Sequence, residues 1–169
     1  MAFAVIIGLY VSLGAMAAVG TVHISHKYVP VKLEAAFFGL LLTPIAAFYL
    51  AFTAYFGAAT AWGLEFGAMV AFGVFGVIGI KAPMTLSTGY ALHGAWDALH
   101  EIQAHLGTNV FAGGEFTPIP LAYGFFCATY DWCLAGYFVT RNEPWRAAWL
   151  PGPSRVDRPG GARPGAPPL

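Results

Sequence analysis

Four ionisable side chains fall within nine residues of an otherwise apolar stretch, LHGAWDALHEIQAH at 92–105. They are His93, Asp97, His100 and Glu101. If this stretch is helical, the four side chains lie within about 100° of one another around the helix axis and share one face. Imidazole and carboxylate groups together favour two chemistries, which are binding of a divalent transition metal and transfer of protons.

Two further acidic residues lie in separate apolar segments, Glu65 in WGLEFG and Asp131 in TYDWC. Counting about 1.5 Å of rise per residue brings both to the depth of the acidic residues at 92–105. The predicted ligands of a divalent Zn, Fe or Mn ion are Glu65, Asp97, His100, Glu101 and Asp131. The predicted proton-transferring catalytic residues are Asp97, Glu101 and His93.

Charge balance favours the metal. Several carboxylates in a medium of low dielectric need a cation or bound protons, and no lysine or arginine lies inside the apolar segments to neutralise them. The simpler interpretation is that these groups only hydrogen-bond across a helical bundle, at about 0.6 kcal/mol for each bond.

The composition identifies the elements that must position these residues. Of the 169 residues 58% are hydrophobic and 9% are charged, whereas soluble domains carry about 25% charged residues. Segments of the length that spans a bilayer lie at 2–22, 36–56, 59–80, 85–106 and 119–140. They lack the alternating pattern of barrel strands, so we expect an all-α integral membrane bundle of about five transmembrane helices. This domain would cover 1–142, and the Pro/Gly/Arg-rich tail at 143–169 is predicted to be disordered.

The basic residues predict the orientation. With five spans, all eight lysines and arginines fall on one side of the membrane: Lys27, Lys32, Lys81, Arg141, Arg146, Arg155, Arg158 and Arg163. Because cytoplasmic loops are enriched in basic residues, the N-terminus should be outside and the C-terminus cytoplasmic. A signal peptide at 2–22 is the less favoured alternative, since no basic region precedes it.

Three connections are expected. HISHKYVPVKLE at 23–34 is predicted to be an interfacial loop, in which His23 and His26 fit a loop or headgroup role better than metal binding. The tripeptide 56–58 around Gly57 should form a tight hairpin, and the glycine- and proline-containing segment 107–120 should form an outer loop that could cover the site.

The order WGLEFG, GYALHGAWDALHE and CATYDWCLAGYF resembles a family of small bacterial integral membrane proteins, classed as a domain of unknown function with HxxWDxxHH and CxxxD motifs. The matching residues are His93, Trp96, Asp97, His100, Cys127, Asp131 and the acidic Glu65. Glu101 departs from the pattern, because the family has a second histidine there. The resemblance implies a shared intramembrane site and a bacterial inner membrane, but no particular reaction.

Three functions are compatible with these residues. The leading hypothesis is a metal-dependent hydrolase or hydroxylase acting on a membrane lipid or isoprenoid. The second is a metal-free isomerase that transfers protons to and from an apolar substrate. The third is an accessory or pigment-binding subunit of a larger membrane complex. A homo-oligomer is compatible with each, and no feature of the sequence favours nucleic-acid binding.

Overall fold

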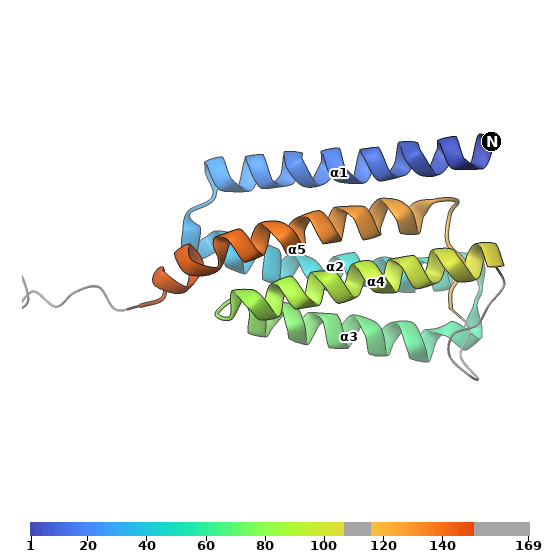
Figure 1. The fold of residues 1–169 in the computed structure, drawn as a ribbon. Helices are drawn as coiled ribbons and strands as arrows, with labels where there is room; N and C mark the ends of the chain where they lie inside the picture. Colours follow the sequence, from blue (N-terminus) through green and yellow to red (C-terminus); the bar gives the residue numbers. More distant parts are fainter. Residues whose placement is uncertain (107–115, 151–169) are drawn as a thin grey trace, which may run out of the picture.

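The computed structural model describes residues 1–106 and 116–150, and helices are the only regular elements in those two ranges. The elements are α1 (Ala2–Tyr28), α2 (Val31–Phe56), the short 3-10 helix η1 (Ala59–Ala61), α3 (Trp62–Gly79), α4 (Pro83–Leu106) and α5 (Tyr123–Ala147). The five long helices lie side by side and alternate in direction (Figure 1). The all-α prediction is confirmed. Most of the predicted outer loop (107–115) and most of the predicted tail (151–169) lie outside the described residues.

The helix ends follow local backbone chemistry. Gly57 ends α2 with φ +67°, a conformation that glycine adopts without steric cost, and the predicted hairpin is confirmed. The predicted interfacial loop at 23–34 is wrong, because α1 continues to Tyr28 and α2 begins at Val31. Only Val29 and Pro30 separate the two helices. Val29 is extended, as the residue before a proline tends to be.

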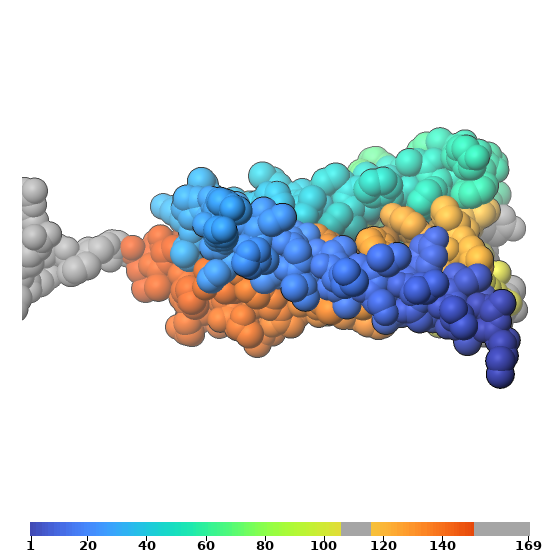
Figure 2. Space-filling model, turned by 90° about the horizontal axis from the view of Figure 1, so that it is seen from above, coloured from blue at the N-terminus to red at the C-terminus, as the bar shows by residue number. Residues whose placement is uncertain are grey.

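Helix packing pairs α4 with α5, α2 with α3, and α1 with α5. Seen from above, α1 runs along the outside of the bundle with α2 on one side and α5 on the other (Figure 2). The backbones of α2 and α3 touch, because a Cβ atom built on Gly39 would lie 2.6 Å from the carbonyl oxygen of Gly76. Small residues at such crossings let membrane helices approach closely.

The interior of the bundle contains an apolar core and, separately, a set of buried ionisable side chains. Near the end that holds the α1–α2 and α3–α4 connections, the core is apolar and aromatic, with Phe38, Leu42, Tyr90, Phe138 and Trp145 buried. The other buried interior groups include the ionisable side chains of α4 and their partners on α2, α3 and α5. The outer surface of the bundle is also largely apolar. Exposed large hydrophobic residues run along α1 and α3, for example Leu9, Leu13, Val70 and Val74.

Three helical segments are long and apolar enough to cross a membrane: Ala2–Tyr28, Val31–Phe56 and Ala59–Gly79. Helices α4 and α5 are similar in length but contain the polar residues of the interior.

The basic residues Lys27, Lys32, Lys81, Arg141 and Arg146 all lie near one end of the bundle, where α1 meets α2, α3 meets α4 and α5 ends (Figure 1). We call this the basic end.

Candidate functional site

Helix α4 directs all four of its predicted site residues into the bundle. Each is exposed by 1% or less, and their partners come from α2, α3, α5 and the segment before α5. Burial of these four groups agrees with the sequence-based expectation that they face the bundle interior. The side chains do not form one shell, however. They divide into three groups at successive heights along α4.

The first group joins His93 and Asp97 of α4 to Asp131 of α5. His93 Nδ1 lies 2.6 Å from Asp131 Oδ2 and 3.3 Å from Asp97 Oδ2. The spacing of four residues places His93 and Asp97 one turn apart on α4. Close packing of α4 and α5 brings Asp131 against both. Two carboxylates therefore share a single imidazole in a buried setting.

Three polar atoms of this group make no hydrogen bond to any described residue: His93 Nε2, Asp97 Oδ2 and Asp131 Oδ1. Leaving a buried polar atom without a partner costs about 1–3 kcal/mol. One ligand atom from each residue can be chosen so that all lie within 4.8 Å of one another, so the group could hold a metal ion. Three protein ligands would leave a coordination position open for water, as in catalytic metal sites.

The distances indicate what metal binding would require. Neighbouring ligands of a tetrahedral ion with bonds of about 2.1 Å lie about 3.4 Å apart. His93 Nδ1 and Asp97 Oδ2, at 3.3 Å, already match this separation. His93 Nδ1 and Asp131 Oδ2 are at hydrogen-bonding distance and, if both were ligands, would have to separate by about 0.8 Å.

Tyr49 of α2 completes this group, and the sequence analysis did not identify it. Its hydroxyl donates a hydrogen bond to Asp97 Oδ1, and its ring stacks on His100 with the ring centroids 4.0 Å apart. Tyr49 thus holds Asp97 and touches the next group along α4. A tyrosine in an apolar helix carries no spacing signal, so only the tertiary contact identifies it.

The second group pairs His100 with Glu65 of α3. His100 Nε2 lies 2.8 Å from Glu65 Oε1, and His100 Nδ1 lies 2.9 Å from the carbonyl oxygen of Trp96. A carbonyl only accepts hydrogen bonds, so Nδ1 carries a proton, and a further proton lies between Nε2 and Glu65. The backbone N–H of Thr117 also donates to Glu65 Oε1. Both nitrogens of His100 are therefore engaged.

The third group places Glu101 at the beginning of α5. Glu101 Oε1 accepts hydrogen bonds from the backbone N–H of Ala122 and from His105, and Oε2 accepts one from the N–H of Gly124. The first N–H groups of a helix lack partners within the helix, and its N-terminus attracts negative charge. Glu101 therefore caps α5, a structural role that the sequence analysis did not consider.

These groups revise the predicted five-residue shell. Asp97 and Asp131 remain together, and His93 joins them as a possible ligand. Glu65 and His100 form a separate pair, and Glu101 caps a helix. A helical wheel predicts which way each side chain of α4 points, but not which residues of the other helices lie at the same height along the bundle. Positions 93 and 100 are separated by about 10 Å along the axis, so the four side chains meet partners at different heights on the neighbouring helices.

Glu101→Gln should lower the free energy of unfolding by about 2 kcal/mol, because the amide can no longer accept hydrogen bonds through both terminal atoms. The measurement is denaturant unfolding in detergent. Glu143→Gln, at an exposed acid on α5, is the control and should change stability by less than about 0.5 kcal/mol. Loss of bound metal from Glu101→Gln without a change in stability would contradict the capping role.

An apolar pocket adjoins the first group. It has a volume of about 330 Å³ and lies between α2 and α5. Its lining residues are Leu41, Ile45, Phe48, Tyr123, Phe126, Cys127, Tyr130 and Asp131. Asp131 is the ionisable carboxylate in this apolar lining. An apolar molecule entering here would therefore meet the polar centre at Asp131.

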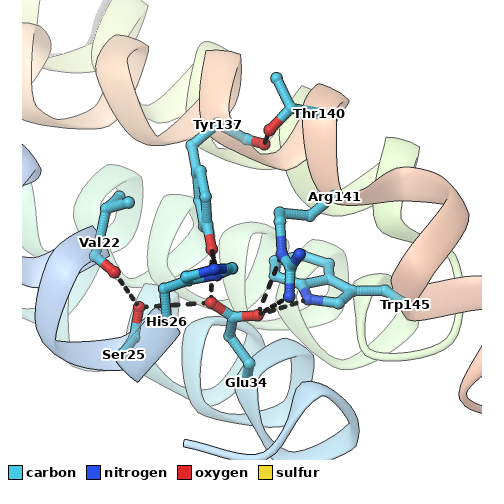
Figure 3. A network of polar contacts seen from close by, with 8 residues as sticks. All are labelled: Val22, Ser25, His26, Glu34, Tyr137, Thr140, Arg141 and Trp145. Atoms are coloured by element: carbon cyan, nitrogen blue, oxygen red, sulfur yellow. Dashed lines mark hydrogen bonds and ion pairs between the residues drawn. The ribbon is translucent and has the colours of Figure 1, made fainter. Parts of the chain in front are cut away.

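A second polar network, near the basic end, was missed by the sequence analysis. Glu34 of α2 is fully buried and accepts hydrogen bonds from Tyr137, Arg141 and Trp145 of α5 (Figure 3). Ser25 of α1 contacts the same carboxylate at 3.5 Å. Glu34 is the last residue of the predicted interfacial loop at 23–34, and the sequence analysis assigned it no role. Its carboxylate instead fastens α1, α2 and α5 together.

The fold and site define a class, an all-helical protein with three helices fit to cross a membrane and a buried His/Asp cluster that could hold a metal. Comparison with protein-family models, curated proteins and solved structures gives no match. The resemblance to the family with HxxWDxxHH and CxxxD motifs therefore stays a prediction.

Proposed function

We propose that the chain is a five-span membrane protein whose His93/Asp97/Asp131 group binds a divalent metal and hydrolyses an apolar, lipid-like ester. The observation that carries the proposal is the convergence of three buried ligand residues, with unpartnered polar atoms, beside an apolar pocket. Membrane embedding of α4 and α5 is supported by burial of their site residues and by exposed Leu92, Trp132 and Val139.

The basic end supports the proposed orientation. Five basic side chains lie at this end of the described bundle, which suits the cytoplasmic face of a bacterial inner membrane. The N-terminus would then be outside, and the centre would lie within the membrane. A substrate would reach it laterally through the pocket between α2 and α5.

Zinc, iron or manganese suits a ligand set of imidazole and carboxylate. A divalent ion held by His93, Asp97 and Asp131 would supply Lewis-acid activation of water, and the oxygen of Asp97 or Asp131 that does not bind the ion would accept the proton. The hydroxide formed in this way would add to the ester carbonyl. The bond from carbon to the leaving oxygen would then break, and the alcohol would leave with the proton held by the carboxylate.

Metal analysis tests the proposal directly. Protein purified in detergent should carry about one divalent metal per chain by mass spectrometry and should cleave a nitrophenyl ester of a long-chain fatty acid. Asp131→Asn and His93→Gln should each weaken metal binding by at least about 100-fold, since removing a ligand costs more than removing its supporting partner. The matched variant Glu65→Gln changes an equally buried acid outside the group and should retain the metal.

Two outcomes would contradict the proposal: wild-type protein without stoichiometric metal, or metal that survives both Asp131→Asn and His93→Gln. If the protein binds metal but does not cleave the ester, the metal site is supported and the proposed hydrolysis is rejected. A hydroxylase would then be tested by oxygen consumption. Loss of a copurifying membrane complex on Asp97→Ala would favour the accessory-subunit alternative.

A second candidate function rests on a different observation. Hydrogen bonds already connect Tyr49 to Asp97 and His93 to Asp131, with His93 Nδ1 3.3 Å from Asp97. Such a chain could take a proton from one carbon of an apolar substrate and return it to another, without a metal. Incorporation of deuterium from heavy water into a bound alkene by metal-free protein would favour this isomerase, and its absence would exclude it.

A further inference from the structure

The basic end contains a pocket that is separate from the polar centre. It has a volume of about 310 Å³ and lies where the α3–α4 turn meets the last part of α5. The lining residues are Lys81, Ala82, Pro83, Met84, Asn142 and Arg146. Two cations and one amide donor thus face one hollow, and the N-terminal residues of α4 form part of its wall.

Several positive side chains lie close together here, and none of them forms an ion pair with an acid within residues 1–106 and 116–150. Lys81 and Lys32, from different connections, both lie over the ring of Trp149, at 5.7 and 4.3 Å from its centroid. Each contact with the ring is favourable, but the two ammonium groups repel each other, and a bound anion would reduce that repulsion. Among the described residues at this end, Glu34 is fully engaged with α5, and Glu143 is not among the pocket's lining residues.

The start of α4 adds to this potential. Pro83 is its first residue, and the helix continues to Leu106, so its positive dipole end borders the pocket. Pro83 has no N–H. The N–H groups of Thr85 and Leu86 donate to the carbonyl oxygen of Ala82, so the start of α4 contributes chiefly its dipole. Lysine and arginine are side chains that bind phosphate in proteins. Trp149 lies beside them, and tryptophan is enriched at the membrane interface.

We propose that this pocket binds the phosphate of an anionic phospholipid headgroup through Lys81, Asn142 and Arg146. The site is independent of the proposed metal chemistry. The headgroup phosphate would sit against the start of α4, and the acyl chains would extend along the apolar outer surface of the bundle. The bound lipid would connect the α3–α4 turn to the end of α5.

The test measures lipid retained by full-length protein in detergent, using native mass spectrometry after titration with phosphatidylglycerol. The double variant Lys81→Gln/Arg146→Gln should weaken binding about 30-fold, or about 2 kcal/mol, at about 1 kcal/mol for each basic residue. Lys27→Gln is the matched control, since this lysine lies at the same end but outside the pocket. It should weaken binding less than threefold.

Further arms identify the source of the phosphate. Phosphatidylcholine with the same acyl chains should bind at least tenfold more weakly than phosphatidylglycerol. Inorganic phosphate at constant ionic strength should not raise the unfolding temperature. Stabilisation by phosphate alone would replace the lipid with a soluble phosphate ligand and overturn the proposal, as would equal losses in Lys27→Gln and the double variant. Unchanged unfolding temperatures will show that the variants fold.

Discussion

Replacing Arg141 with alanine should lower the free energy of unfolding by about 3 kcal/mol. The substitution removes two hydrogen bonds and the positive charge from the Glu34 carboxylate, which is fully buried. Breaking a buried ion pair by removing one partner costs about 3–5 kcal/mol. Tyr137 and Trp145 still donate to the carboxylate, so the lower part of this range is expected. Denaturant titration in detergent measures the change.

Two variants identify the cause. Arg146→Ala removes an exposed arginine from the same helix and should change stability by less than about 0.5 kcal/mol. Adding Glu34→Gln to Arg141→Ala removes the unpaired charge and should recover more than half of the lost stability. If the double variant were as unstable as Arg141→Ala, the loss would come from packing of the arginine side chain rather than from the buried charge.

Gly124→Ala should cost about 3 kcal/mol and disrupt the polar centre as well. A Cβ atom at Gly124 would lie 2.5 Å from the backbone oxygen of Asp97 and 2.9 Å from Cβ and Oε2 of Glu101. Backbone atoms cannot move aside cheaply, so α4 and α5 must separate, and overpacking costs about 1–3 kcal/mol or more. Separation would also pull Asp97 away from Asp131. Both stability and metal binding should therefore fall.

Gly136→Ala provides the control on the same helix, because its added Cβ would meet nothing within 4 Å. It should leave stability unchanged or raise it slightly, since alanine favours helix over glycine by about 1 kcal/mol. Equal stability of the Gly124→Ala and Gly136→Ala variants would show that α4 and α5 are not packed as closely as the structure has them. Metal binding by both variants gives a second, independent comparison.

Arg141 and Gly124 lie in opposite halves of the bundle. The Glu34 network stabilises the basic end and joins α1 and α2 to α5, and the contact at Gly124 sets the approach of α4 to α5 beside the candidate centre. A variant of the first kind should lower stability while leaving metal affinity unchanged. A variant of the second kind should lower both. This difference separates damage to the fold from damage to the site.

The sequence alone determined that the fold is all-α and where several helices end, because apolar length and backbone preference are local properties. Long apolar runs predicted α1, α2 and α3, and Gly57 predicted a turn, whereas α4 begins at Pro83, two residues before the predicted span at 85–106. Polarity was a poorer guide to conformation. HISHKYVPVKLE reads as a loop, yet all but two of its residues are helical, since polar residues at a helix end can still continue the helix.

The sequence also predicted that the ionisable face of α4 turns inward, since in the expected membrane bundle charge facing lipid is costly. Only the tertiary structure decided which of these groups meet. The contacts of each group depend on how the separate helices are positioned along the bundle axis. Asp131 contacts His93 and Asp97, Glu65 contacts His100, and Glu101 contacts the start of α5. Only the tertiary structure identified Tyr49 and the buried Glu34 as important, because each contacts residues that are distant in the sequence.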